Sequence, residues 1–143
     1  MVGVSTLFTK IIDGDIPGRF VWRDDEVVAF LTINPIATGH VLVVPIAEVD
    51  HWLDLPAPLA ERCMTVAQEI GRAQMDAFSP TRIGMIIAGL EVPHTHLHLI
   101  PIATEADLSF AKADPSPDPA ALDAAAEAVR AALRSRGRSE VAS

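Results

Sequence analysis

Residues 94–101 read His-Thr-His-Leu-His-Leu-Ile-Pro, and this stretch constrains the fold strongly. Three of the five histidines of the protein stand here at alternate positions. Successive side chains of a β-strand point to opposite faces, so a strand would place His94, His96 and His98 on one face and apolar side chains on the other. A helix would scatter the three rings around its axis. The short apolar run with its closing proline therefore predicts a strand that buries one face and presents imidazoles on the other.

The rest of the pattern predicts an α+β fold. Apolar stripes and capping signals predict a short helix from the N-cap Ser5 to Gly14, one long helix over residues 57–78 and a C-terminal helix over residues 119–136 with Asp118 as its N-cap. Short apolar runs predict further strands over residues 20–23, 27–33, 40–45 and 82–89. Because hairpins and one long helical connection join them, we expect an antiparallel sheet of about five strands.

The length and composition predict one domain without a membrane anchor. A chain of 143 residues can bury a proper core, and we expect a single domain over residues 1–136 followed by a flexible polar tail over 137–143. No apolar run approaches the roughly 20 residues that span a bilayer, and the N-terminus lacks the pattern of a signal peptide. The single cysteine, Cys63, excludes an internal disulfide and suits a reducing compartment. We therefore expect a cytoplasmic protein without membrane partners.

The charge disfavours one class of partner. The formal net charge is −8, whereas a protein that binds polymeric nucleic acid needs a basic patch. A small phosphorylated ligand stays compatible with this charge, because the local charge of a site can oppose the global one.

Two chemistries suit the histidine row. Neutral imidazoles bind zinc, but the outer rings of the row lie about 13 Å apart, so a zinc site would need a further ligand such as His40, His51 or Glu91. Alternatively, one neutral imidazole attacks phosphorus while its neighbours donate hydrogen bonds to the phosphate oxygens and the leaving group. The second use fits a row, with one attacking ring between two donors.

The same stretch is similar to the His-φ-His-φ-His-φ-φ signature of the histidine triad (HIT) superfamily. Residues 11–17 resemble the "IIxGxIP" opening of its Hint-like branch, and residues 34–45 resemble its "NPxxxGHxLVxP" block. Residues 24–31 resemble the hairpin between these two blocks. The similar segments cover residues 5–102 in the order that the family has them, as in a bacterial Hint-like or HIT-like protein.

The resemblance implies a homodimeric HIT-like fold and an enzyme without a cofactor or metal. It implies hydrolysis or transfer at the α-phosphate of purine nucleoside monophosphate derivatives, of the phosphoramidate or dinucleotide type, through a covalent nucleotidyl-histidine. His96 would be the nucleophile and His98 would hold the phosphate oxygens, while His94 and His40 would complete the catalytic set and help to orient the nucleophile. The substrate would contact Leu7, Phe8, Ile11, Phe30, Leu31, Thr32, Ile33 and Gly89.

The sequence departs from the family pattern in three places, and two alternative functions stay open. Thr32 stands where the family has an acidic or amide residue for the ribose, and Leu90-Glu91-Val92 replaces a segment that contacts the phosphate. These two departures favour, as one alternative, a nucleotide-binding protein with little turnover. Thr6 and Thr9 replace a Cys-x-x-Cys pair that binds zinc in bacterial relatives, which leaves His51 as a surface or dimer residue. The other alternative is a zinc hydrolase that uses His-x-His.

Overall fold

The computed structural model describes residues 4–143, so residues 1–3 of the expected domain lie outside the described residues. The fold is α+β, with a five-stranded antiparallel sheet in the order β1-β2-β3-β5-β4, as the sequence predicted. The helices and strands follow one another as α1 (Leu7–Ile12), β1 (Phe20–Arg23), β2 (Val27–Leu31), β3 (Val41–Pro45), η1 (Trp52–Asp54), α2 (Ala57–Phe78), β4 (Arg82–Ile86), β5 (Leu97–Ile102), η2 (Glu105–Asp107), η3 (Phe110–Lys112) and α3 (Pro119–Ser135).

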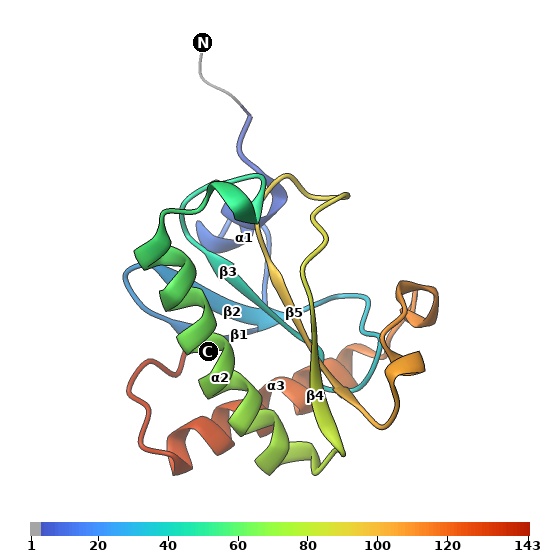
Figure 1. Cartoon of the computed structure of the whole chain (residues 1–143). Helices are drawn as coiled ribbons and strands as arrows, with labels where there is room; N and C mark the ends of the chain where they lie inside the picture. Colours follow the sequence, from blue (N-terminus) through green and yellow to red (C-terminus); the bar gives the residue numbers. More distant parts are fainter. Residues whose placement is uncertain (1–3) are drawn as a thin grey trace.

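The sheet separates two apolar cores. Helices α2 and α3 pack on each other and cover one face, where they contact alternate strand residues such as Ala29, Val43 and Leu99 (Figure 1). The intervening residues Phe30 and Leu42 point to the opposite face and meet α1 in a second, smaller cluster. Because side chains alternate along a strand, every residue of β2 and β3 is buried on one side or the other. The face that α1 covers only in part is the one with room for a ligand.

The histidine segment enters the sheet later than its pattern predicted. Strand β5 begins at Leu97, so His94 and His96 precede it. The backbone N–H of Thr95 donates to Val49 O at 2.7 Å, and the N–H of His94 donates to Val92 O at 2.8 Å. The backbone of this segment is therefore bonded to the neighbouring loops rather than to a strand.

The first helix begins one residue later than predicted, because Thr6 rather than Ser5 is its N-cap. Thr6 has extended backbone angles, and its Oγ1 accepts a hydrogen bond from the N–H of Thr9. The helix ends at Ile12, and Gly14 follows with a positive φ of 87°, which agrees with its predicted role as a helix stop. The last helix has the predicted N-cap, since Asp118 Oδ1 accepts from Ala120 N at 3.1 Å.

The end of the chain, for which a flexible tail over residues 137–143 is expected, makes backbone hydrogen bonds to β1. Arg23 N donates to Glu140 O at 2.9 Å, Ala142 N donates to Val21 O at 3.2 Å, and Val141 forms an isolated antiparallel bridge with Trp22. The reason is that β1 is an edge strand, whose free backbone groups accept a further extended segment. The tail thus covers the outer edge of β1.

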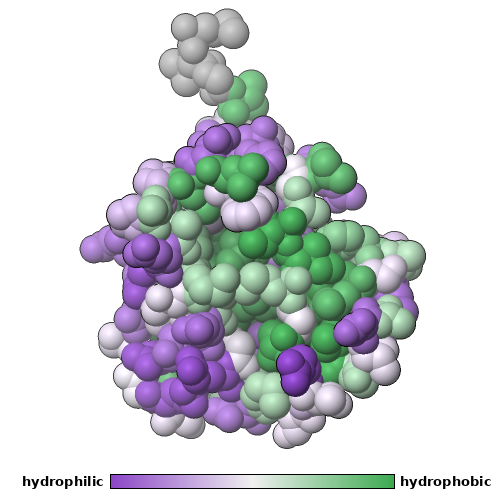
Figure 2. All heavy atoms as spheres, viewed as in Figure 1, coloured by the Kyte–Doolittle hydropathy of each residue, from purple (hydrophilic) through white to green (hydrophobic). Residues whose placement is uncertain are grey.

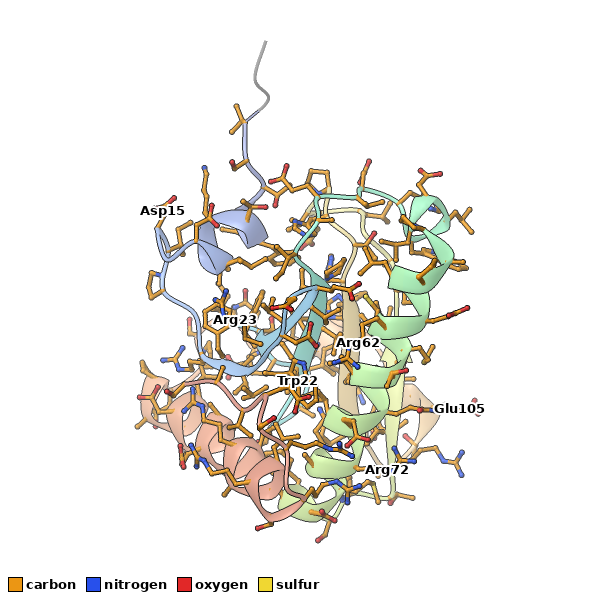
Figure 3. All side chains as sticks on the ribbon, turned by 90° about the vertical axis from the view of Figure 1, so that its left-hand side faces the viewer. Asp15, Trp22, Arg23, Arg62, Arg72 and Glu105 are labelled. Atoms are coloured by element: carbon orange, nitrogen blue, oxygen red, sulfur yellow. The ribbon has the colours of Figure 1, made fainter. Side chains whose placement is uncertain are left out.

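A partly buried polar contact ties the β1–β2 turn to α2. Trp22 Nε1 and Arg62 Nη2 both donate to Asp24 Oδ2, at 2.9 and 2.8 Å. Figure 3 labels Trp22 of β1 and Arg62 of α2, which lie near each other in this view. Over residues 4–143, no helix combines the length and the apolar character that crossing a membrane requires.

Candidate active site

A pocket of about 360 Å³ opens on the face of the sheet that α1 covers in part. His96 and His98 line this pocket. All the residues predicted to contact the substrate line it as well, namely Leu7, Phe8, Ile11, Phe30, Leu31, Thr32, Ile33 and Gly89. The structure therefore brings two histidines and a mainly apolar wall into one cavity.

The ring of His96 presents a lone pair in this environment. Its Nδ1 lies 2.7 Å from the carbonyl oxygen of His94. A carbonyl only accepts hydrogen bonds, so Nδ1 carries the proton and Nε2 of the neutral ring carries the lone pair. Burial lowers the pKa of His96, although the hydrogen bond to the His94 carbonyl partly opposes that shift. The edge-on ring of Phe8, with 4.8 Å between the ring centroids, holds the imidazole plane.

The ring of His98 has the opposite tautomer. Ile36 N–H donates to His40 Nδ1 at 3.0 Å, so the neutral His40 ring carries its proton on Nε2. That Nε2 lies 2.9 Å from His98 Nδ1 and must donate to it. His98 Nδ1 is then an acceptor, and the proton of the neutral His98 ring is on Nε2. The backbone N–H of Ile36 thus sets the tautomer of His40, and His40 in turn sets that of His98. The result is an N–H donor on His98 beside the lone pair of His96.

Burial keeps both rings of this pair neutral at pH 7. It lowers the pKa of His40 to about 3, and the neighbouring His98 and His96 act in the same direction. Burial also lowers the pKa of His98 to about 4, with a further contribution from His96. The hydrogen-bond chain described above requires neutral rings, so its tautomers hold at physiological pH.

Neither His94 nor His40 lines the pocket. For His94 this differs from the single row with His96 and His98 that the alternation predicted. His94 is fully buried, with its Nε2 donating to Pro45 O at 2.7 Å and its Nδ1 accepting from Thr6 Oγ1 at 2.7 Å. It reaches His96 only through its backbone carbonyl. His40 contacts the ring of His98 rather than that of the predicted nucleophile, because its turn lies opposite β5 next to the Leu42–His98 pair.

The residues around His94 do not fit a zinc ion. Both ring nitrogens of His94 are held by hydrogen bonds, and Thr6 caps α1 with the same hydroxyl that donates to His94. Within residues 4–143, no three His, Cys, Asp or Glu side chains come together in a way that could hold a metal ion. His51 is exposed, and its Nδ1 accepts from Leu53 N at 3.1 Å.

Further residues line the pocket in addition to the predicted substrate contacts. Phe110 packs edge-on against His98 with 5.0 Å between ring centroids, and Glu91 lines the pocket beside Leu90 and Val92. The remaining unpredicted lining residues are Ile16, Pro17, Gly18, Arg19, Asn34, Leu42 and Ala88. The alternation of side chains along β3 could have identified Leu42 as a pocket residue. The positions of Phe110 and Arg19 could not be identified in this way, because they depend on how the connecting segments fold back onto the sheet.

Lowering the pH from 7 to 5 is expected to destabilise the wild-type protein more than a His40→Gln variant. Glutamine offers an acceptor and a donor but does not titrate. In the wild type the pKa of His40 lies near 3 when folded and near 6.5 when unfolded, so below pH 6.5 the unfolded chain binds a proton that the folded chain rejects. The expected difference is on the order of 2 kcal/mol in the free energy of unfolding. Urea denaturation at both pH values measures it, and equal losses in the two proteins would contradict the buried neutral ring.

The four histidines described above lie within a segment that matches a known protein family. A family model described as HIT domain matches residues 13–105, which include His40, His94, His96 and His98. The chain is 36% identical over 102 residues to the Protein hit of Bacillus subtilis, an alignment that covers 68% of this chain and 70% of that protein. It is also 36% identical over 102 residues to a purine nucleoside phosphoramidase of Escherichia coli K12, with 67% of this chain and 86% of that protein covered.

A solved structure has the same fold over nearly the whole chain. It is a Zn-bound histidine triad family protein from Mycobacterium smegmatis, with a TM-score of 0.80 and 27% sequence identity. The superposition covers 93% of this chain and 96% of that protein. The likeness therefore extends beyond the matched residues 13–105 into the C-terminal helix.

Proposed function

The chain belongs to the HIT domain family, and from this premise we propose that it is a nucleotide hydrolase or transferase. The proposed substrates are purine nucleoside monophosphate derivatives. The reaction breaks the bond between the α-phosphorus and the leaving group. The relative of E. coli that bears the name purine nucleoside phosphoramidase supports this substrate class. The observation that carries the proposal is the pair of opposite tautomers in one pocket, a lone pair on His96 and an N–H donor on His98.

In the proposed reaction, His96 Nε2 attacks the α-phosphorus. A bond forms between Nε2 and phosphorus while the bond from phosphorus to the leaving group breaks, and the leaving group takes the bonding electron pair and a proton from solvent water. The ring becomes a cation, and its Nδ1–H bond to the His94 carbonyl strengthens as this charge develops. His98 Nε2–H donates to a non-bridging phosphate oxygen throughout. Water then attacks phosphorus and gives a proton to the solvent, the P–N bond breaks with its electron pair returning to Nε2, and the neutral His96 and a nucleoside monophosphate are released.

The apolar part of the pocket suits a purine base. Phe8 and Phe30 pack edge-on with 5.6 Å between their ring centroids, and Leu7 and Ile33 remain exposed at the pocket. Apolar and aromatic walls with few polar groups are typical of small-molecule sites. Thr32 Oγ1 accepts a weak hydrogen bond from Asn34 N at 3.3 Å, and its hydroxyl hydrogen can still donate to a ribose oxygen.

The function is tested by incubating the purified protein with adenosine or guanosine 5′-phosphoramidate and measuring the nucleoside monophosphate released. We expect turnover with both purines. Calorimetry with a nucleoside monophosphate on the same samples distinguishes a hydrolase from the alternative, a binding protein with little turnover. Tight binding of a nucleoside monophosphate without release of product from any of these phosphoramidates would favour that alternative and contradict a hydrolase.

Replacing Glu91 by glutamine is expected to raise kcat/KM about two- to fivefold at low ionic strength. Glu91 lines the pocket, and its carboxylate repels the anionic phosphate that the proposed reaction places at His96. The gain should shrink in about 0.5 M salt, because added ions screen an exposed charge. Glu61→Gln on α2 removes the same charge from a residue that does not line the pocket and serves as the control. An equal gain in both variants would contradict a local effect.

We further propose that the protein forms a homodimer through β4 and α2. Strand β4 lies at the edge of the sheet, and no strand within residues 4–143 pairs with its outer side. Met64 and Met75 of α2 and Met85 of β4 are 45%, 39% and 36% exposed. Figure 2 shows apolar surface across the middle of the face on which β4 lies. An exposed apolar patch beside an open strand edge favours association, and sedimentation showing only monomer at micromolar concentration would contradict it.

A further inference from the structure

Gln74 is a buried polar side chain near the C-terminal end of α2, and the proposed reaction gives it no direct part. Its exposed fraction is 0%. The side-chain Nε2 donates to Gly39 O at 2.8 Å and to Leu99 O at 3.0 Å. No donor among residues 4–143 reaches its Oε1. Two carbonyl acceptors require a donor between them, so the amide must turn its NH₂ group towards them, even though its oxygen is then left without a protein partner.

The two carbonyls belong to the neighbours of the paired histidines. Gly39 precedes His40, and Leu99 follows His98. Strands β3 and β5 pair from Val43–Leu97 to Val41–Leu99, and the ladder stops there because the chain turns away at His40. The amide of Gln74 thus joins the two chains at the point where the ladder of backbone hydrogen bonds ends.

A second contact from α2 fixes the same turn. Gly39 has a φ of 85°, and a Cβ built on it would lie 2.2 Å from the ring of Phe78. The ring of Phe78 therefore packs directly on the backbone of Gly39. Since Gln74 and Phe78 are one helical turn apart, the last turn of α2 holds the turn before His40 by a hydrogen bond and by packing.

We propose that Gln74 is a positioning residue for the His40–His98 pair. By joining Gly39 to Leu99, it keeps His40 Nε2 within hydrogen-bond distance of His98 Nδ1. That bond makes His98 Nδ1 an acceptor and leaves the His98 Nε2–H available to a phosphate oxygen. Gln74 touches neither substrate nor ring, so its effect passes through the backbone on either side of the pair. Its kinetic consequence rests on the proposed function, whereas its effect on the tautomer of His98 does not.

The test compares Gln74→Met with the wild type by ¹⁵N NMR of the imidazole nitrogens and by steady-state kinetics. Methionine keeps the length of the side chain but cannot donate to either carbonyl. We expect the His98 signals to change from a single Nε2–H tautomer to a mixture, while His96 remains an Nδ1–H tautomer on the His94 carbonyl. We expect kcat on a purine phosphoramidate to fall about 10- to 100-fold with KM changed less than about twofold.

Ile70→Val is the matched control, because Ile70 is fully buried in α2 and belongs to the core between α2 and the sheet. It lowers stability without removing a donor from Gly39 or Leu99. Wild-type His98 signals in Gln74→Met, with a loss of kcat no larger than in Ile70→Val, would overturn the proposal. If Gln74→Met does not fold, Gln74→Asn takes its place, because asparagine keeps the amide but shortens its reach. The His98 signals of that variant then test the proposal in the same way. A wild type without turnover would refute the proposed function, while the tautomer of His98 would still test the role of Gln74.

Discussion

Replacement of His96 by alanine is expected to lower kcat/KM by about four to six orders of magnitude. The reason is that the Nε2 lone pair of His96 is the group that attacks phosphorus in the proposed reaction, and the His94 carbonyl fixes this lone pair by binding the proton on Nδ1. The folded structure should persist, since His96 lies at the pocket and precedes β5. The measurement is release of a nucleoside monophosphate from a purine phosphoramidate.

His51→Ala is the control for this variant. His51 is exposed and does not line the pocket, so its removal should leave kcat/KM within about twofold. A denaturing alkaline quench of the wild type during turnover, followed by mass spectrometry, should detect a nucleotide bound to the peptide that contains His96. Full activity of His96→Ala would contradict the assignment of the nucleophile, whatever the peptide analysis finds.

Replacement of Gly39 by alanine is expected to destabilise the fold by about 2 to 5 kcal/mol. Two costs add at this position. A residue with a Cβ is strained at a φ of 85°, and the new Cβ would overlap the ring of Phe78. Because Gly39 directly precedes His40, the strain should also displace the ring that binds His98. The loss is measured by urea denaturation, with hydrolysis measured under native conditions.

Gly14→Ala separates the two costs, because Gly14 has a φ of 87° but no atom within 4 Å of the added Cβ. It should lose only the backbone contribution, about 1 to 2 kcal/mol. The double variant Gly39→Ala/Phe78→Ala removes the overlapping ring and should recover part of the extra loss relative to Phe78→Ala alone. Equal losses for Gly14→Ala and Gly39→Ala would show that the Phe78 contact does not constrain the turn.

The sequence was sufficient for those features that depend on local pattern. The bounds of α2 follow from Pro56 and the apolar stripes, and the face of the sheet that carries His96 and His98 follows from alternation. The start of β5 was predicted too early, because the N–H of Thr95 finds its partner at Val49, far away in the sequence. The placement of Phe110 in the pocket depends in the same way on tertiary contacts, which position η3.

The tautomers of the histidines are a clear limit of sequence reasoning. The pattern identified which residues are histidines on which face, but the proton of His98 is set by the N–H of Ile36 acting through His40. Likewise, the separate position of His94 depends on Thr6 and the carbonyl of Pro45. These partners are identifiable only once the turns around β3 are in place, because a hydrogen bond needs distances that no spacing in the sequence encodes.

In the proposed assembly through β4, the pairing of Val141 with Trp22 limits the number of copies that can join through their sheets. With the outer side of β1 covered, β4 is the sheet edge left open within residues 4–143. A sheet with two open edges can add neighbours without end, as fibres do, whereas a sheet with one open edge is filled by a single symmetric neighbour. The residues paired with β1 would thus prevent a further subunit from adding at that edge, so that the proposed assembly ends at two subunits.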